Sequence, residues 1–139
     1  MIGVVVVTHG QLANELVNAA EMIVGDLPQF TAVSIGWHDD VNDAREEIAQ
    51  AIERVRAGDG CEGVLLLTDM FGGTPSNLGM AFLEKEGVEV ITGVNLPMLI
   101  KLAGLRSSAG LLAVAHEMRE HGRNAIWVAS DLLRGEKTP

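Results

Sequence analysis

The first ten residues place the tightest limit on how this chain folds. The segment Ile2–Thr8 contains four consecutive valines and no charged residue. A continuous β-branched run of this kind is typical of a parallel strand that is buried on both faces. His9 and Gly10 follow at once, before a helical pattern begins. His9 is therefore predicted at the carboxyl end of a buried strand, where open α/β sheets place their functional residues. A histidine that merely ends the strand is the alternative interpretation.

The rest of the chain repeats this alternation of apolar strands and amphipathic helices. The pattern predicts strands over residues 2–8, 30–35, 63–68, 88–92 and 124–130, and helices over 11–24, 41–57, 76–86, from 97 onward, and 108–121. Strands that alternate with helices at this spacing indicate an α/β fold with a single doubly wound, mostly parallel sheet and helices on both faces. We expect the strand order 2-1-3-4 for the first four strands.

Length and charge limit the classes of protein to which the chain can belong. The 139 residues, 47% of them apolar, suit one domain, expected over residues 1–131 with a short tail at 132–139. The net charge of −9 argues against nucleic acid or anionic membrane as a partner, because both attract basic patches. The single cysteine excludes an internal disulfide, and no signal-peptide pattern is present, so we expect a cytoplasmic protein.

A second apolar strand ends in a polar residue in the same way as the first. Asp69 directly follows the run 63–68. In the predicted strand order the two strands are neighbours at the point where the order reverses, so His9 and Asp69 would face one crevice. A carboxylate that accepts the Nδ1 proton of a histidine leaves Nε2 unprotonated and nucleophilic at neutral pH. The alternative for Asp69 is a turn residue or helix cap.

The loop after Asp69 carries the sequence Gly72-Gly73-Thr74 just before a predicted helix. Glycines let a backbone approach a ligand closely, and amides at a helix N-terminus bind anions. Beside a histidine nucleophile, this loop and Gly10 suit the binding of a transferred phosphoryl group. The chain has no Walker lysine, so ATP is not the expected donor.

Few other residues suggest a site. The neighbours in His38–Asp40 would point in different directions, so we expect no metal ion, and we predict no cofactor. Met70, Phe71 and Trp37 are apolar residues near the predicted site. We interpret them as candidate contacts for a partner protein, and packing within their own loops is the alternative.

Four segments of the chain, taken in order, match the motifs of a known family. They are Val7–Gly10, Ala20–Gly25, Thr68–Asn77 and Gly93–Leu99. Together they resemble the IIA component of the mannose family of the bacterial phosphoenolpyruvate-dependent sugar phosphotransferase system (PTS). The resemblance implies that His9 is phosphorylated by the phosphocarrier protein HPr, that Asp69 holds this histidine, and that the hydroxyl of Thr74 lies beside the phosphoryl group.

The resemblance also implies partners. The expected activity is that of a phosphotransferase that passes the phosphoryl group from His9 to a separate IIB component in sugar uptake, and meets the membrane only through permease subunits. The expected assembly is a homodimer in which the last strand, residues 124–130, is exchanged and pairs antiparallel with the partner sheet. Because the loop 36–40 departs from the family pattern, a regulatory IIA-like module that controls a partner protein is the alternative. A phosphoryl donor to dihydroxyacetone kinase is a third hypothesis.

Overall fold

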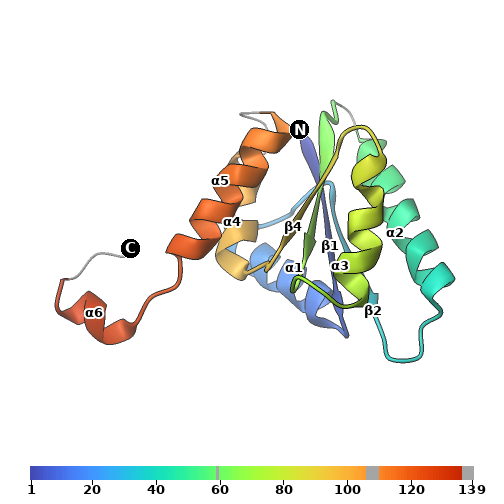
Figure 1. Ribbon diagram of the computed structural model, residues 1–139. Helices are drawn as coiled ribbons and strands as arrows, with labels where there is room; N and C mark the ends of the chain where they lie inside the picture. The colour runs from blue at the N-terminus through green and yellow to red at the C-terminus, as the bar shows by residue number, and fades with distance from the viewer. Residues whose placement is uncertain (59, 106–109, 136–139) are drawn as a thin grey trace.

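The apolar strands pair side by side into a parallel sheet that lies between two layers of helices (Figure 1). The computed structural model describes residues 1–58, 60–105 and 110–135. In chain order its elements are β1 (Ile2–His9), α1 (Leu12–Val24), β2 (Phe30–Ile35), α2 (Val41–Arg56), β3 (Gly63–Thr68), α3 (Thr74–Met80), the 3-10 helix η1 (Ala81–Glu84), β4 (Val88–Thr92), α4 (Leu96–Leu105), α5 (Leu111–Asn124) and α6 (Ala129–Leu133). The sheet order is β2-β1-β3-β4, and every pairing is parallel, so the predicted fold class and strand order are confirmed.

Strand β1 explains the valine run, because it lies inside the sheet and faces a core on each side. Val4 and Val6 point into a cluster that includes residues of α1, α4 and α5. Val5 and Val7 point into the opposite cluster, which includes residues of α2 and α3. Successive side chains of a strand alternate between faces, so a strand covered on both sides must be apolar throughout.

None of the helices among the described residues has both the length and the apolar character that crossing a membrane requires.

The register of β1 and β3 brings the ends of these two strands to one edge of the sheet. Val7 of β1 lies opposite Thr68 of β3. Because the strands are parallel and in register, the residues that follow each of them leave the sheet side by side. His9 and Asp69 therefore become neighbours although 60 positions separate them in the sequence.

Two predicted helix boundaries differ from the structure for identifiable reasons. Helix α3 begins at Thr74, two residues early, since Pro75 is well suited to the first turn of a helix. Helix α5 runs to Asn124 and passes through Gly122, so it extends past the predicted end at residue 121. Gly122 is buried, and a Cβ there would lie 2.7 Å from Sδ of Met98, so this glycine allows α4 and α5 to pack closely. Residues 108 and 109, predicted as the start of this helix, lie outside the described residues.

The described chain forms no strand over residues 124–130. Helix α5 occupies Asn124, residues 126–128 pair with no strand among the described residues, and α6 begins at Ala129. A strand needs a neighbouring strand to bond its backbone groups, and this segment leads away from the sheet (Figure 1). Its apolar side chains are consequently exposed: Ile126 by 71%, Trp127 by 43% and Val128 by 63%.

Asp40 is expected to stabilise the start of α2. Its carboxylate accepts hydrogen bonds from the backbone N–H groups of Asn42 at 2.8 Å and Asp43 at 3.2 Å. Loss of such an N-cap costs about 1 kcal/mol, so Asp40→Ala should lower the free energy of unfolding by about that amount. Asp40→Asn keeps an acceptor oxygen and should lose less than half as much. Urea denaturation measures both values, and equal losses in the two variants would contradict the capping role.

Candidate functional site

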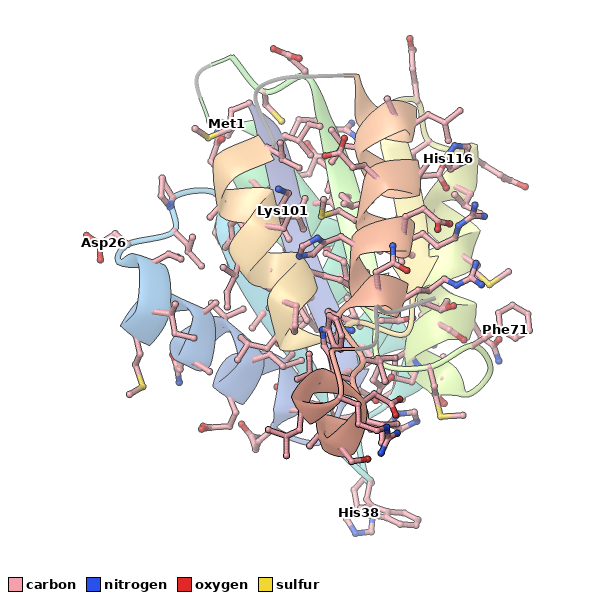
Figure 2. The ribbon with its side chains drawn as sticks, turned by 90° about the vertical axis from the view of Figure 1, so that its left-hand side faces the viewer. Met1, Asp26, His38, Phe71, Lys101 and His116 are labelled. Atoms are coloured by element: carbon pink, nitrogen blue, oxygen red, sulfur yellow. The ribbon has the colours of Figure 1, made fainter. Side chains whose placement is uncertain are left out.

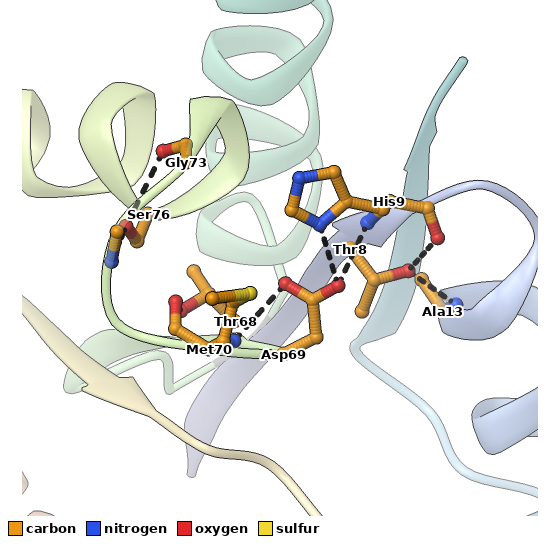
Figure 3. Close-up of polar contacts among 9 residues, drawn as sticks. Thr8, His9, Ala13, Thr68, Asp69, Met70, Gly73 and Ser76 are labelled. Atoms are coloured by element: carbon orange, nitrogen blue, oxygen red, sulfur yellow. Dashed lines mark hydrogen bonds and ion pairs between the residues drawn. The ribbon is translucent and has the colours of Figure 1, made fainter. Parts of the chain in front are cut away.

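The carboxyl end of the sheet holds a histidine and an aspartate in direct contact (Figure 3). His9 is the last residue of β1, and Asp69 directly follows β3. Nδ1 of His9 lies 2.8 Å from Oδ2 of Asp69, and the backbone N–H of His9 donates to the same oxygen at 3.0 Å. The other carboxylate oxygen accepts the backbone N–H of Met70 at 3.1 Å. The structure thus brings together the two residues that the strand ends singled out.

This contact selects one form of the imidazole. A carboxylate next to Nδ1 is satisfied when Nδ1 carries the proton, and in the neutral ring Nε2 then keeps its lone pair. The His9 side chain is 51% exposed, whereas that of Asp69 is only 14% exposed. The nucleophilic nitrogen therefore belongs to an accessible side chain, while the group that orients it is largely covered. A base oriented by a third group in this way is the logic of a catalytic triad.

The charge of Asp69 is stabilised by His9. Burial raises the pKa of Asp69, but the hydrogen bond from the His9 ring, the bond from the His9 backbone N–H and the attraction of the ring charge together outweigh burial. The net pKa of Asp69 is therefore below its ordinary value of 3.8. Asp69 is ionised at neutral pH, as an acceptor for the Nδ1 proton must be.

The glycine loop approaches the other nitrogen of the ring. Gly72 and Gly73 have φ values of 95° and 85°, a region that side chains other than glycine rarely adopt. A Cβ on Gly73 would lie 3.2 Å from both Cε1 and Nε2 of His9, so the backbone of Gly73 borders the nucleophilic nitrogen. Glycine at this position keeps the space next to Nε2 free for a small group.

Two predicted phosphoryl-binding residues do not supply free amides. The N–H of Gly10 donates to the carbonyl of Ile35 at 2.8 Å, and the N–H of Gly72 donates to Oγ of Ser76 at 2.8 Å. These amides hold the loops together, so Gly10 and Gly72 shape the site without donating to a ligand. Ile35 is far enough from Gly10 along the chain that local sequence gives no signal for that bond, whereas Ser76 lies only four positions after Gly72.

A cleft of about 560 Å³ opens beside His9. It is lined by His9, Gly10, Ile35, Gly36, Trp37 and Thr74. The cleft thus joins the loop after β2 to the start of α3 across the end of β1. Thr74 is exposed and contributes a hydroxyl to this cleft. Gly10, Trp37 and Thr74 therefore share one cavity with the reactive histidine.

Three large apolar side chains, one of them in this cleft and two in the loop after Asp69, are exposed to solvent. Trp37 is 99% exposed, Phe71 is 73% exposed and Met70 is 53% exposed. Figure 2 shows Phe71 and His38 projecting away from the body of the protein at two separate places. Exposed apolar side chains of this size next to a reactive group are typical of a surface that another protein contacts.

Among the described residues, no three His, Cys, Asp or Glu side chains are grouped so that they could hold a metal ion.

Comparisons with known proteins agree with this geometry. The family model for "PTS system fructose IIA component" matches residues 3–119. The mannose-specific EIIAB component of the PTS of Escherichia coli K12 is 36% identical over 134 residues, which are 90% of this chain but 39% of that protein. The chain thus spans about two fifths of the length of such relatives. The fructose-specific EIIA component of Bacillus subtilis is 29% identical over 99% of this chain and 93% of that protein. The chain therefore belongs to the mannose-family IIA components of the PTS, as its four motifs predicted.

Solved structures share the fold over nearly the whole chain. The mannose/sorbose-specific IIA subunit from Enterococcus faecalis superposes with a TM-score of 0.78 at 28% identity, covering 91% of this chain and 92% of that one. The PTS IIA protein associated with the fucose utilization operon of Streptococcus pneumoniae superposes with a TM-score of 0.83 at 24% identity, covering 95% of this chain and 96% of that one. The second likeness concerns the fold alone.

The lowered pKa of Asp69 predicts how this residue contributes to stability at different pH values. The contribution of the ionised carboxylate is complete above the unfolded-state pKa near 3.8 and is lost as the pH falls through the lower native pKa. A carbon-13 NMR titration of the Asp69 carboxyl should therefore give a midpoint below 3.8. His9→Ala removes the ring donor and leaves the effect of burial, so it should raise the midpoint. A midpoint that His9→Ala does not move would contradict the assignment.

Proposed function

We propose that this protein carries a phosphoryl group on Nε2 of His9, accepting it from phospho-HPr and passing it to a IIB component during sugar uptake. The observation that supports this role most directly is the 2.8 Å contact between Nδ1 of His9 and Asp69, which leaves Nε2 as the nucleophile beside the glycine loop. Membership of the mannose-family IIA components supports the same class of reaction. Relatives named for mannose, fructose and sorbose systems support sugar uptake as the setting.

In the proposed reaction the lone pair of Nε2 attacks the phosphorus atom of the phosphohistidine of HPr. A new nitrogen–phosphorus bond forms on His9 as the bond to the HPr imidazole breaks, and the electron pair of that bond returns to the HPr ring. The Nδ1 proton of His9 stays on the ring and remains hydrogen-bonded to Asp69, whose charge stabilises the positive charge that develops on the ring. The reverse order of bond changes transfers the group to the next carrier.

The site also balances the negative charge of the phosphoryl group. Such a group on Nε2 is repelled by ionised Asp69 across the ring, which favours its onward transfer. Helix α1, which spans 13 residues from Leu12, starts close behind His9. The positive end of its dipole can stabilise an anion nearby by up to about 1–2 kcal/mol. The hydroxyl of Thr74 and the backbone of Gly73 complete the proposed phosphoryl-binding set.

The surface around the cleft is the proposed docking face for HPr. Trp37 in the cleft and Met70 and Phe71 in the loop after Asp69 supply exposed apolar area. The net charge of −9 favours a partner that presents basic residues at the contact, because opposite charges accelerate encounter. We propose that the IIB component uses the same face, since His9 must be reached by both partners.

We further propose a homodimer that exchanges the C-terminal segment. Within the described residues β4 pairs only with β3, so its outer edge is open. A cleft of about 450 Å³ runs along this edge between β4 and α5. The segment 126–128, with its exposed Ile126, Trp127 and Val128, has the β-rich apolar composition to add antiparallel to β4 of a second copy. A two-fold exchange covers both open edges, which proteins otherwise protect from uncontrolled pairing.

His9 is expected to be the only phosphorylated residue. Incubation with phosphoenolpyruvate, enzyme I and HPr should label the protein, and His9→Ala should abolish the label. His38→Ala, His116→Ala and His121→Ala serve as matched controls and should be labelled normally. The bond should be labile to acid and stable to base, as a phosphoramidate is. Labelling that survives in His9→Ala, or an acid-stable label, would contradict the proposed mechanism.

The dimer is expected to depend on the C-terminal segment. Wild-type protein should be dimeric at micromolar concentration by light scattering. The double substitution Ile126→Asp and Val128→Asp should yield monomers, because each change buries a charge at the proposed interface. Met22→Asp places the same charge on a side chain that is 87% exposed on α1 and should leave the dimer intact. A double variant that remains dimeric would show that this segment is not the interface.

A further inference from the structure

Within the part of the chain that the structure describes, the polar residues that are fully buried gather at one place. Among the described residues, the buried polar side chains are three hydroxyls, Thr8, Thr68 and Ser76, each fully covered. All three lie at the carboxyl end of the sheet, around His9 and Asp69 (Figure 3). A buried hydroxyl costs free energy unless it forms hydrogen bonds, so its place is informative. The gathering of these hydroxyls at the site indicates that they contribute to its geometry.

Thr8 fixes the chain on both sides of His9. Its Oγ1 accepts the backbone N–H of Ala13 at 2.7 Å and lies 3.2 Å from the carbonyl oxygen of His9, to which it donates. The amide of Ala13 is one of the first four of α1, which have no partner inside the helix. Thr8 therefore ties the end of β1 to the start of α1, with His9 between them.

The position of the His9 backbone matters because one oxygen serves two donors. Both the ring and the backbone N–H of His9 bond to Oδ2 of Asp69, at 2.8 and 3.0 Å. A shift of this peptide changes both contacts at once. Thr8 restrains that shift through its bond to the carbonyl oxygen of His9, so its hydroxyl acts on the orientation of the ring without touching it.

Ser76 fixes the loop that borders the reacting nitrogen. Its Oγ accepts the N–H of Gly72 at 2.8 Å and lies 3.4 Å from the carbonyl oxygen of Gly73. Two adjacent glycines have more backbone freedom than any other pair of residues. The buried hydroxyl restrains them in the conformation that places Gly73 against Nε2 of His9.

We propose that Thr8 and Ser76 are positioning residues for phosphoryl transfer. Thr8 fixes the backbone that carries the His9 ring, and Ser76 fixes the Gly73 backbone that borders Nε2. This inference rests on the proposed function and names the residues that prepare its site. Thr68 lies 3.5 Å from the carbonyl oxygen of Met70, a longer contact that leads away from Nε2.

The test uses variants that separate the hydroxyl from the shape of the side chain. Thr8→Val keeps the branched shape and removes the hydroxyl, whereas Thr8→Ser keeps the hydroxyl. Misplacement of reacting groups by about 1 Å lowers rates up to 100-fold, so Thr8→Val and Ser76→Ala should slow single-turnover transfer from saturating phospho-HPr roughly 10- to 100-fold. The concentration of phospho-HPr at half-saturation should stay unchanged, and Thr8→Ser should transfer at close to the wild-type rate.

A control separates positioning from general stability. Val88→Ala removes buried apolar volume at the amino end of β4, at the opposite end of the sheet, and should lower the melting temperature without slowing transfer. Nitrogen-15 NMR of the His9 ring gives a second measurement, because Thr8→Val should broaden or shift the Nδ1 and Nε2 signals while Val88→Ala should not.

The outcomes distinguish the two proposals. Wild-type protein that is never phosphorylated on His9 would overturn the proposed function itself. Wild-type labelling with unchanged rates in Thr8→Val and Ser76→Ala would overturn the positioning roles alone. Equal slowing in Val88→Ala would also overturn them, since stability would then explain the effect. If Thr8→Val does not fold, the rates of Ser76→Ala and Thr8→Ser decide between these results.

Discussion

The structure depends on the burial of β1 between two cores. A strand inside a parallel sheet with helices on both faces has no side that tolerates a polar residue along its length. Every side chain from Ile2 to Thr8 is buried, and the first exposed one is His9. The same constraint on β3 makes Asp69 the first residue after the strand that is not fully covered. The packing that holds the domain together thus also delivers a histidine and a carboxylate to one edge.

At that edge, the chemistry rests on a single carboxylate oxygen. Oδ2 of Asp69 accepts hydrogen bonds from both the ring Nδ1 and the backbone N–H of His9, so the imidazole is fixed by two bonds to one atom. This arrangement lowers the pKa of Asp69 despite its burial. Opposite the carboxylate, the loop at Gly73 leaves Nε2 room for a small group, and Thr74 shares the cleft. The Nδ1 side of the ring thus orients the histidine through Asp69, and the Nε2 side leaves space for a small group.

The sequence predicts much of this, and what it does not predict has physical causes. Strands β2, β3 and β4 have the predicted bounds, because periodicity and β-branched composition are local signals. The pairing of His9 with Asp69 follows from strand order. The segment 124–130 carries the composition of a strand, but strand formation requires a neighbour, and composition does not supply one. Gly122 and the amide of Gly10 depend on contacts between distant elements, and no local pattern encodes those contacts.

His9 lies at the end of a central β-strand and not on a flexible loop, and this limits how other molecules reach it. A residue on a flexible segment can move from one active site to another, but a residue at the end of a central strand is held in place by the sheet. Under the proposed function, the donor and the acceptor of the phosphoryl group would therefore bind the same surface at different times. Each of them would then compete with the other for access to His9.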